Sequence, residues 1–151
     1  MTDLIENVIW ERVFWVEDNR GSIRHFMRND DPLFTKFGEV YFSTVYPDVV
    51  KGWHMHTEMT LNYVCVVGKV KVAVYDPESG QVDTFLLEDH GNGYTRLTIP
   101  PGLWNGFRAP VGWADPVTVA NFTDIPHNPE EIMRVPPDSF AYDWGPYKVG
   151  G

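Results

Sequence analysis

The stretch KVKVAVYDPESG, residues 69–80, indicates the kind of fold that this sequence forms. Its first half alternates valine with lysine or alanine, which is the period of two expected of a β-strand with one buried face. Its second half brings together Asp, Pro, Ser and Gly, the residues that favour a tight turn. We therefore predict a strand over residues 69–74 that ends in a turn at residues 76–80.

The same combination recurs along the chain. Turns rich in glycine and proline, such as that at residues 100–102, separate short stretches with strand character. Many short strands with regular turns are typical of a sandwich or barrel, so we predict one all-β domain over residues 1–151. Helix signals are restricted to one short turn at residues 30–37 and to about one to two turns at residues 128–133, with Asn128 as the N-cap of the second. The further predicted strands are residues 8–16, 39–46, 61–67, 82–87, 96–99 and 117–121.

The chain is acidic, with 21 Asp and Glu against 12 Lys and Arg and a formal net charge of −9. Such a charge repels phosphate backbones and anionic membranes, so we expect neither nucleic acid nor a membrane as a partner. Aromatic residues make up 15% of the sequence, and some are expected to line a small-molecule cavity. The only cysteine, Cys65, lies in an apolar run and is expected to be a buried thiol. A lone cysteine and no recognisable secretion signal predict a cytoplasmic protein.

The stretch KGWHMH, residues 51–56, carries the strongest chemical signal. Residues two apart on a strand point to the same side, so His54 and His56 are expected to project into one space. Two imidazoles placed in this way suit a metal ion, a general base or an anion site. A second stretch, LTIPPGLWNGF at residues 97–107, predicts a strand, a Pro-Gly turn and an aromatic return strand.

In layout, these two stretches resemble the two sequence motifs of the cupin barrels. The resemblance implies a cupin-type double-stranded β-helix, or jelly-roll barrel. Cupins that hold a metal add a glutamate and a third histidine, but Leu61 and Asn105 stand at those positions here. We therefore predict no metal and no other cofactor. If a metal does bind, His54 and His56 are its expected ligands.

An ordered series of short motifs resembles the dTDP-4-dehydrorhamnose 3,5-epimerases over most of the chain. The resemblance implies a nucleotide-sugar substrate, a homodimer and proton abstraction next to a ketone, with His54 as the base. Lys51 stands where that family has an arginine, and Arg20 matches an arginine that is implied to contact the nucleotide diphosphate. The motifs lie at residues 18–21, 43, 49–54, 66–68, 72–76, 99–107, 121–130 and 142–144.

The catalytic pattern of that family is incomplete in this sequence. Asn121 stands where the family has a tyrosine acid, and an amide can bind substrate but cannot deliver a proton as a phenol does. The aspartate that orients the family's histidine has no predicted counterpart. We expect His56, His127, Tyr41 or Tyr63 to replace the missing acid. The remaining predicted substrate contacts are His56, Asn105, Asn121, Trp53, Trp104 and His127.

Three functions are consistent with these residues. The leading one is a sugar-nucleotide epimerase or isomerase that acts on a dTDP-4-keto-6-deoxysugar or a similar sugar. Loss of one proton-transfer partner would restrict it to epimerisation at a single centre or to ketoisomerisation. The second is a non-catalytic cupin in which Trp53, Trp104 and Phe107 stack on a sugar nucleotide or related metabolite. The third is a metal-dependent cupin enzyme that uses His54 and His56, with either Glu58 or water molecules as the further ligands.

The N-terminal strand carries large apolar side chains that need covering. Trp10, Phe14 and Trp15 fall within residues 8–16 and are expected to be exposed on an isolated chain. Such a strand suits a dimer in which two copies exchange strands, in agreement with the homodimer that the resemblance implies.

Overall fold

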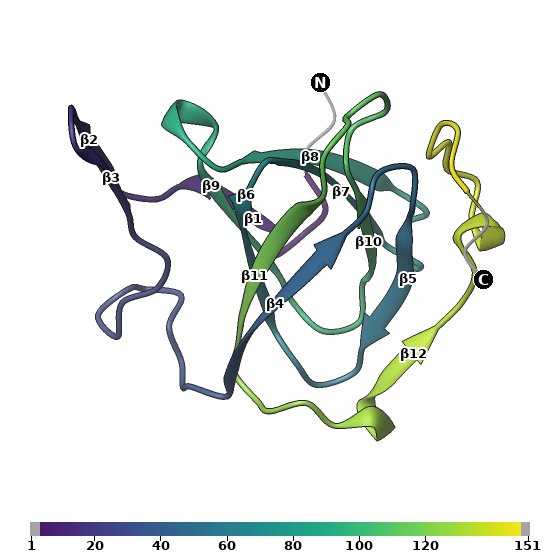
Figure 1. The fold of residues 1–151 in the computed structure, drawn as a ribbon. Coiled ribbons are helices and arrows are strands. Elements are labelled where there is room, and N and C mark those ends of the chain that lie inside the picture. Colours follow the sequence, from purple (N-terminus) through teal and green to yellow (C-terminus); the bar gives the residue numbers. More distant parts are fainter. Residues whose placement is uncertain (1–3, 149–151) are drawn as a thin grey trace.

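The structure is a computed structural model and describes residues 4–148. Two five-stranded antiparallel sheets face each other and form a barrel (Figure 1). The first contains, in spatial order, β1 (Ile9–Arg12), β9 (Thr95–Ile99), β6 (Leu61–Val67), β11 (Val117–Thr123) and β4 (Glu39–Val45). The second contains β12 (Ile132–Arg134), β5 (Lys51–His56), β10 (Trp104–Arg108), β7 (Lys69–Tyr75) and β8 (Val82–Glu88). This architecture confirms the predicted all-β, cupin-type jelly roll.

Strands β2 (Trp15–Asp18) and β3 (Gly21–Arg24) pair only with each other, and this hairpin projects away from the barrel (Figure 1). The helical segments of residues 4–148 are three short 3-10 turns, η1 (Gly91–Gly93), η2 (Pro129–Glu131) and η3 (Pro137–Ser139). In this part of the chain, no helix has the length and apolar character needed to cross a membrane.

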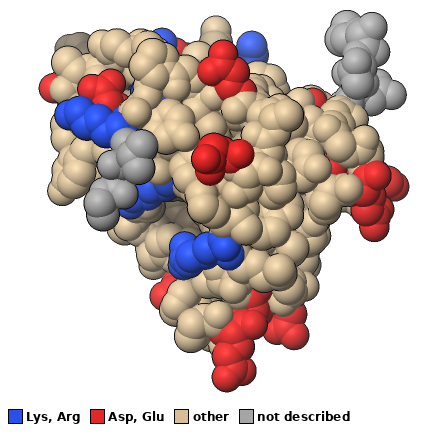
Figure 2. Space-filling model, turned by 90° about the vertical axis from the view of Figure 1, so that its right-hand side faces the viewer, with Lys and Arg blue, Asp and Glu red and all other residues tan. Residues whose placement is uncertain are grey.

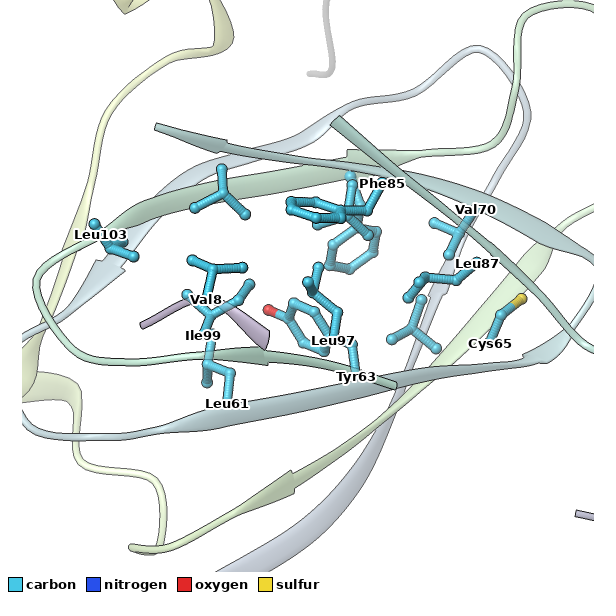
Figure 3. Packing of buried hydrophobic residues seen from close by; sticks show 14 of the residues in the cluster. Val8, Leu61, Tyr63, Cys65, Val70, Phe85, Leu87, Leu97, Ile99 and Leu103 are labelled. Atoms are coloured by element: carbon cyan, nitrogen blue, oxygen red, sulfur yellow. The ribbon is translucent and has the colours of Figure 1, made fainter. Parts of the chain in front are cut away.

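The hydrophobic core lies between the two sheets (Figure 3). The valines of β7 alternate as predicted, and Val70, Val72 and Val74 are fully buried. Phe85 faces them from the neighbouring strand β8. Cys65 is a buried free thiol, as expected, and burial raises its pKa to about 12. A thiol with so high a pKa stays protonated and unreactive near neutral pH.

Three predicted elements differ from the observed ones. The strand expected over residues 8–16 is divided into β1 and β2, because the backbone at Phe14 bonds to His25 and starts the hairpin. Residues 30–37 form turns instead of a helix, since the carboxylate of Asp31 accepts bonds from Leu33 and Arg96. The predicted helix at residues 128–133 is the single turn η2 followed by strand β12, although the Asn128 side chain caps η2 as expected.

Two features of β5 position the functional residues. Asn105 pairs with His54 and Phe107 pairs with Lys51, so β5 contains one extra residue at this point, a β-bulge. The bulge places Lys51 on the same face as His54. The residues after β11, here called the C-terminal arm (residues 126–148), run down the outside of the barrel and add β12 to the free edge of β5 (Figure 1).

Candidate active site

A cavity of about 730 Å³ opens between the two sheets at the His-containing end of β5. Its walls come from β4, β5, β6 and β11 of the barrel and from β12 of the C-terminal arm. His54 and His56 both line it, and their ring centroids are 6.0 Å apart. The prediction that two histidines spaced by two residues share one space is therefore confirmed.

His56 is paired with a carboxylate. Its Nδ1 lies 2.5 Å from Oε2 of Glu131, and both side chains are buried. The other oxygen of Glu131 accepts the backbone N–H groups of Met59, at 2.9 Å, and Glu58, at 3.2 Å. Burial raises the pKa of Glu131, but these three bonds outweigh it and hold that pKa below its ordinary value. An ionised Glu131 accepts a hydrogen bond from Nδ1–H of His56, so in the neutral form of this ring Nε2 carries the lone pair.

His54 belongs to a different hydrogen-bond chain. The Tyr63 hydroxyl donates to Oδ1 of Asn105 at 3.0 Å, and its oxygen lies 3.3 Å from Nε2 of His54. Because the Tyr63 proton is committed to Asn105, the pattern assigns the ring proton of His54 to Nε2. Burial lowers the pKa of His54 to about 3, with further contributions from the charges of His56, Arg134 and Lys51. His54 is therefore neutral at physiological pH.

A second tyrosine faces the same cavity with its proton uncommitted. Oδ1 of Asn121 accepts the backbone N–H of Asn62 at 3.0 Å, which fixes the orientation of the amide. Nδ2 of Asn121 then donates to the Tyr41 hydroxyl at 2.8 Å. Since the phenolic oxygen accepts this bond, its own hydrogen is available to a molecule in the cavity. Burial raises the pKa of Tyr41 and keeps the phenol protonated.

Positive charge reaches the cavity from two sides. Lys51 lines it from β5 and donates to Oγ of Ser43 at 3.0 Å. Arg134 lines it from β12, where it pairs in register with His54. Glu39 is a further charged group in the wall, and its carboxylate accepts the backbone N–H of His127 at 2.9 Å.

Most of the predicted site residues lie at this cavity. Six of them line it, namely His54, His56, Lys51, Trp53, Asn121 and His127. Asn105 is fully buried behind them and supports Tyr63. Arg20 lies elsewhere, on the exposed turn of the β2–β3 hairpin, where it forms an ion pair with Asp18.

The predicted stacking role of two tryptophans is corrected by their packing. Trp53 contributes to the cavity wall, but it is only 1% exposed and its Nε1 donates to the Pro137 carbonyl at 3.0 Å. Its indole packs against Phe140 and Trp144 of the C-terminal arm. Trp104 also packs against Phe140 and has no part in the cavity wall. Neither indole leaves a ring face free for a ligand, because the arm covers this side of β5 and β10.

Sequence reasoning missed Glu131 and Arg134. The family comparison left the histidines without an orienting carboxylate, and the structure corrects this by placing Glu131 against His56. In the sequence, Glu131 reads as an acidic residue at a helix start, and 75 positions separate it from its partner. The available signal was the position of both residues in a segment that returns to the barrel after the last core strand.

The two histidines do not gather further metal ligands. Within residues 4–148, no three His, Cys, Asp or Glu side chains are grouped so that they could hold a metal ion. One ring nitrogen of His56 is bound to Glu131 and one of His54 to Tyr63. Glu58, the third ligand considered above, contacts Glu131 through its backbone.

Known proteins with similar sequences and structures are sugar epimerases and isomerases. A crystal structure of a dTDP sugar isomerase from Desulfovibrio desulfuricans G20 is 36% identical, with a TM-score of 0.86 over 93% of this chain and 92% of that one. A probable low-salt glycan biosynthesis epimerase, Agl13, from Haloferax volcanii is 35% identical over 99 residues, which span 61% of this chain and 62% of that protein. The dTDP-6-deoxy-D-glucose-3,5-epimerase RmlC from Legionella pneumophila shares the fold, with 19% identity and a TM-score of 0.81 over 97% of this chain and 82% of that one.

A family model matches the barrel and ends before β12. The model described as FdtA: WxcM-like, C-terminal, covers residues 6–126. The match therefore contains His54, His56 and Tyr41, whereas Glu131 and Arg134 lie beyond it on the C-terminal arm. Because the match extends over most of the sequence, this chain belongs to the FdtA, WxcM-like C-terminal family.

Proposed function

We propose that the protein is a sugar-nucleotide epimerase or isomerase that removes a proton from a carbon next to the ketone of a dTDP-4-keto-6-deoxysugar. The observation that carries the proposal is the hydrogen bond between His56 and Glu131 at the wall of a cavity that also receives the Tyr41 hydroxyl. Base and acid thus face one space large enough for a sugar nucleotide. The 36%-identical relative, a dTDP sugar isomerase, supports this substrate class.

His56 has the better geometry for the base. A base next to a ketone must accept a proton and carry the resulting positive charge for the lifetime of the enolate. Glu131 stabilises that charge on His56 across 2.5 Å. His54, the base expected from the family motif, has a pKa of about 3, so its protonated form is strongly disfavoured. We therefore assign proton abstraction to His56 and a neutral, substrate-facing role to His54.

Tyr41 is the proposed acid. The family's tyrosine position is occupied by Asn121, and Tyr41 is its partner in the β11–β4 register. The phenol of Tyr41, on the adjacent strand β4, thereby replaces the tyrosine that the family has at position 121. The Asn121 amide holds the Tyr41 hydroxyl by a hydrogen bond. Its free proton can bond to the enolate oxygen or return to carbon after the base has acted. Tyr63 does not have this freedom, because its proton is donated to Asn105.

The reaction class can be tested by incubating the protein with dTDP-4-keto-6-deoxyglucose and identifying the products by proton NMR. We expect an epimer or a ketoisomer to accumulate with the native protein. His56→Asn should abolish turnover with the fold intact, because asparagine cannot accept the proton. Full turnover by the His56→Asn variant would show that His56 is not the base and would assign that role to His54. The His54→Asn variant is therefore measured in parallel. No product with the native protein would overturn the proposed function for this substrate.

We also propose that the protein is a homodimer. The outer face of β4 carries exposed apolar side chains, with Phe42 67% and Val40 41% accessible, and Phe37 continues the patch at 65%. An apolar area of this kind is typical of a surface that another chain covers. The β2–β3 hairpin projects from its own barrel, so Arg20 would meet a nucleotide diphosphate only in the cavity of a second copy (Figure 1).

The dimer is tested by light scattering coupled to size-exclusion chromatography. The native protein should have a measured molar mass twice that of one chain. The Phe42→Glu variant should have the molar mass of a single chain. A monomeric native protein would contradict the proposal.

The free, buried Cys65 suits a reducing compartment, and we propose the cytoplasm as the location.

A further inference from the structure

Two cationic side chains face the cavity without an acidic partner. Lys51 bonds only to the neutral Ser43 hydroxyl, and Arg134 makes no hydrogen bond or ion pair within residues 4–148. Two exposed arginines outside the cavity do have acidic partners, since Arg20 pairs with Asp18 and Arg28 with Asp30. On the side of the molecule where the C-terminal arm lies, Lys and Arg are few and scattered (Figure 2). The pair is therefore a local feature of the cavity and not part of a general basic surface.

The strand register brings both cations next to His54, Arg134 from the neighbouring strand β12 and Lys51 from the same strand β5. Arg134 pairs with His54 across the β12–β5 ladder, and directly paired residues present their side chains on the same face. Ile132 follows the same rule opposite His56 and also lines the cavity. Lys51 lies three residues before His54, on the same face because of the bulge. By strand geometry the Cα atoms of Lys51 and Arg134 are roughly 11 Å apart, a separation that two long side chains can close around one anion.

The electrostatic environment of His54 agrees with this placement. The charges of Arg134 and Lys51 both lower the pKa of His54, so both lie close enough to act on the ring. An anion bound between them would lie next to the neutral imidazole. The repulsion of such an anion by Glu131 is reduced, because three hydrogen-bond donors surround that carboxylate and it does not line the cavity.

Buried bonds hold the C-terminal arm, which carries Arg134, against the barrel. Nη1 of Arg108 donates to the carbonyls of Trp144, at 2.8 Å, and Pro146, at 2.7 Å. Trp144 also packs on the closely apposed Gly52 and Gly106, where any side chain on Gly106 would meet the Gly52 backbone at 2.9 Å. The backbone that carries Arg134 is thereby positioned before a ligand arrives, which lowers the conformational entropy lost on binding.

We propose that Arg134, supplied by the C-terminal arm outside the family match, binds the anionic part of the substrate together with Lys51. The ligand class is a diphosphate ester, and the subsite rests on the proposed function for its identification with the diphosphate of a nucleotide sugar. Arg134 presents a planar fork of donors that suits two phosphate oxygens, while Lys51 adds a point charge. The sugar ring would then extend from the subsite toward His56 and Tyr41.

The test is the affinity for dTDP, measured by calorimetry at two salt concentrations. dTDP has no ketone, so binding is independent of the proposed chemistry. The native protein should bind dTDP, and Arg134→Gln should weaken binding about 10- to 150-fold, since a hydrogen bond to a charged group contributes about 1.5–3 kcal/mol. Arg134→Lys should recover part of this loss, and the dependence on salt should be smaller in Arg134→Gln.

Arg28→Gln is the matched control, because it removes one positive charge that is paired with Asp30 outside the cavity. It should bind dTDP as the native protein does. Equal affinity of Arg134→Gln and the native protein would overturn the proposal, as would equal losses in Arg134→Gln and Arg28→Gln. Specific loss in Arg134→Gln without turnover by the native protein would support the subsite and reject the proposed reaction. Turnover by the native protein, with an unchanged dTDP affinity in Arg134→Gln, would support the proposed reaction and reject the subsite.

Discussion

Replacement of Glu131 by glutamine removes one charge and reverses one hydrogen bond. The amide oxygen of glutamine can still accept the backbone N–H groups of Glu58 and Met59, so the local chain keeps its anchor. Its amide nitrogen then faces Nδ1 of His56, where the carboxylate oxygen was 2.5 Å away. Two donors cannot share that position, so His56 must present its lone pair at Nδ1 and carry its proton on Nε2. The nitrogen proposed to face the substrate is then no longer a base.

The expected loss follows from two contributions. A charge-assisted hydrogen bond of about 1.5–3 kcal/mol corresponds to roughly 10- to 150-fold in rate. Together with the loss of the reactive tautomer, removal of the orienting carboxylate costs up to about 10⁴-fold in total in a comparable histidine site. We therefore expect Glu131→Gln to lower kcat by about 10²–10⁴-fold. The affinity for dTDP should stay within about twofold, because Glu131 is held away from the anion subsite.

The assay compares kcat, KM and dTDP affinity for Glu131→Gln and for Glu130→Gln. Glu130 is the neighbouring acidic residue, is exposed, and does not line the cavity. Its replacement should leave all three quantities unchanged. A Glu131→Gln protein with native kcat would refute the role of Glu131 in holding the reactive tautomer. Equal losses in both variants would show that net charge, and not the bond to His56, is responsible.

Four further outcomes are expected. Tyr41→Phe should slow product formation by about 10²–10⁴-fold while solvent exchange at the acidic carbon persists, whereas equal loss of both would remove Tyr41 from the acid role. Because the folded-state pKa of Glu131 is lowered, its stabilising effect is complete above the ordinary value of 4.5 and is lost as pH falls; unfolding experiments should find a weaker acid limb in Glu131→Gln. His54 should remain neutral down to about pH 3 by NMR, and titration near pH 6.5 would contradict the buried site. Arg108→Met should lower the free energy of unfolding by about 1–3 kcal/mol and speed hydrogen exchange in the C-terminal arm, since the carbonyls of Trp144 and Pro146 lose their donor.

Local patterns were sufficient for the barrel and for half of the site. The alternation of Val70, Val72 and Val74 predicted a strand with one buried face, and the spacing of His54 and His56 predicted a shared cavity. Both inferences depend only on the period of two in a strand, which is set by backbone geometry. Both could therefore be made without knowledge of the tertiary contacts.

The other half of the site depends on where the C-terminal arm docks. Glu131 meets His56 only because β12 pairs with the free edge of β5 in one register. The same docking covers Trp53, whose aromatic character had suggested a ligand platform. Nothing in the sequence near Trp53 distinguishes a side chain that faces a ligand from one that faces a distant aromatic segment. Long-range pairing and the bulge at Lys51 decide this, and neither has a local signature.

The most direct test of the account is proton NMR of dTDP-4-keto-6-deoxyglucose in deuterium oxide with the native protein. The account predicts that deuterium replaces hydrogen at a carbon next to the ketone faster than in the protein-free control, and that His56→Asn removes this exchange. Exchange at the blank rate with the native protein, or native exchange in both the His56→Asn and the His54→Asn variants, would contradict proton abstraction in this cavity.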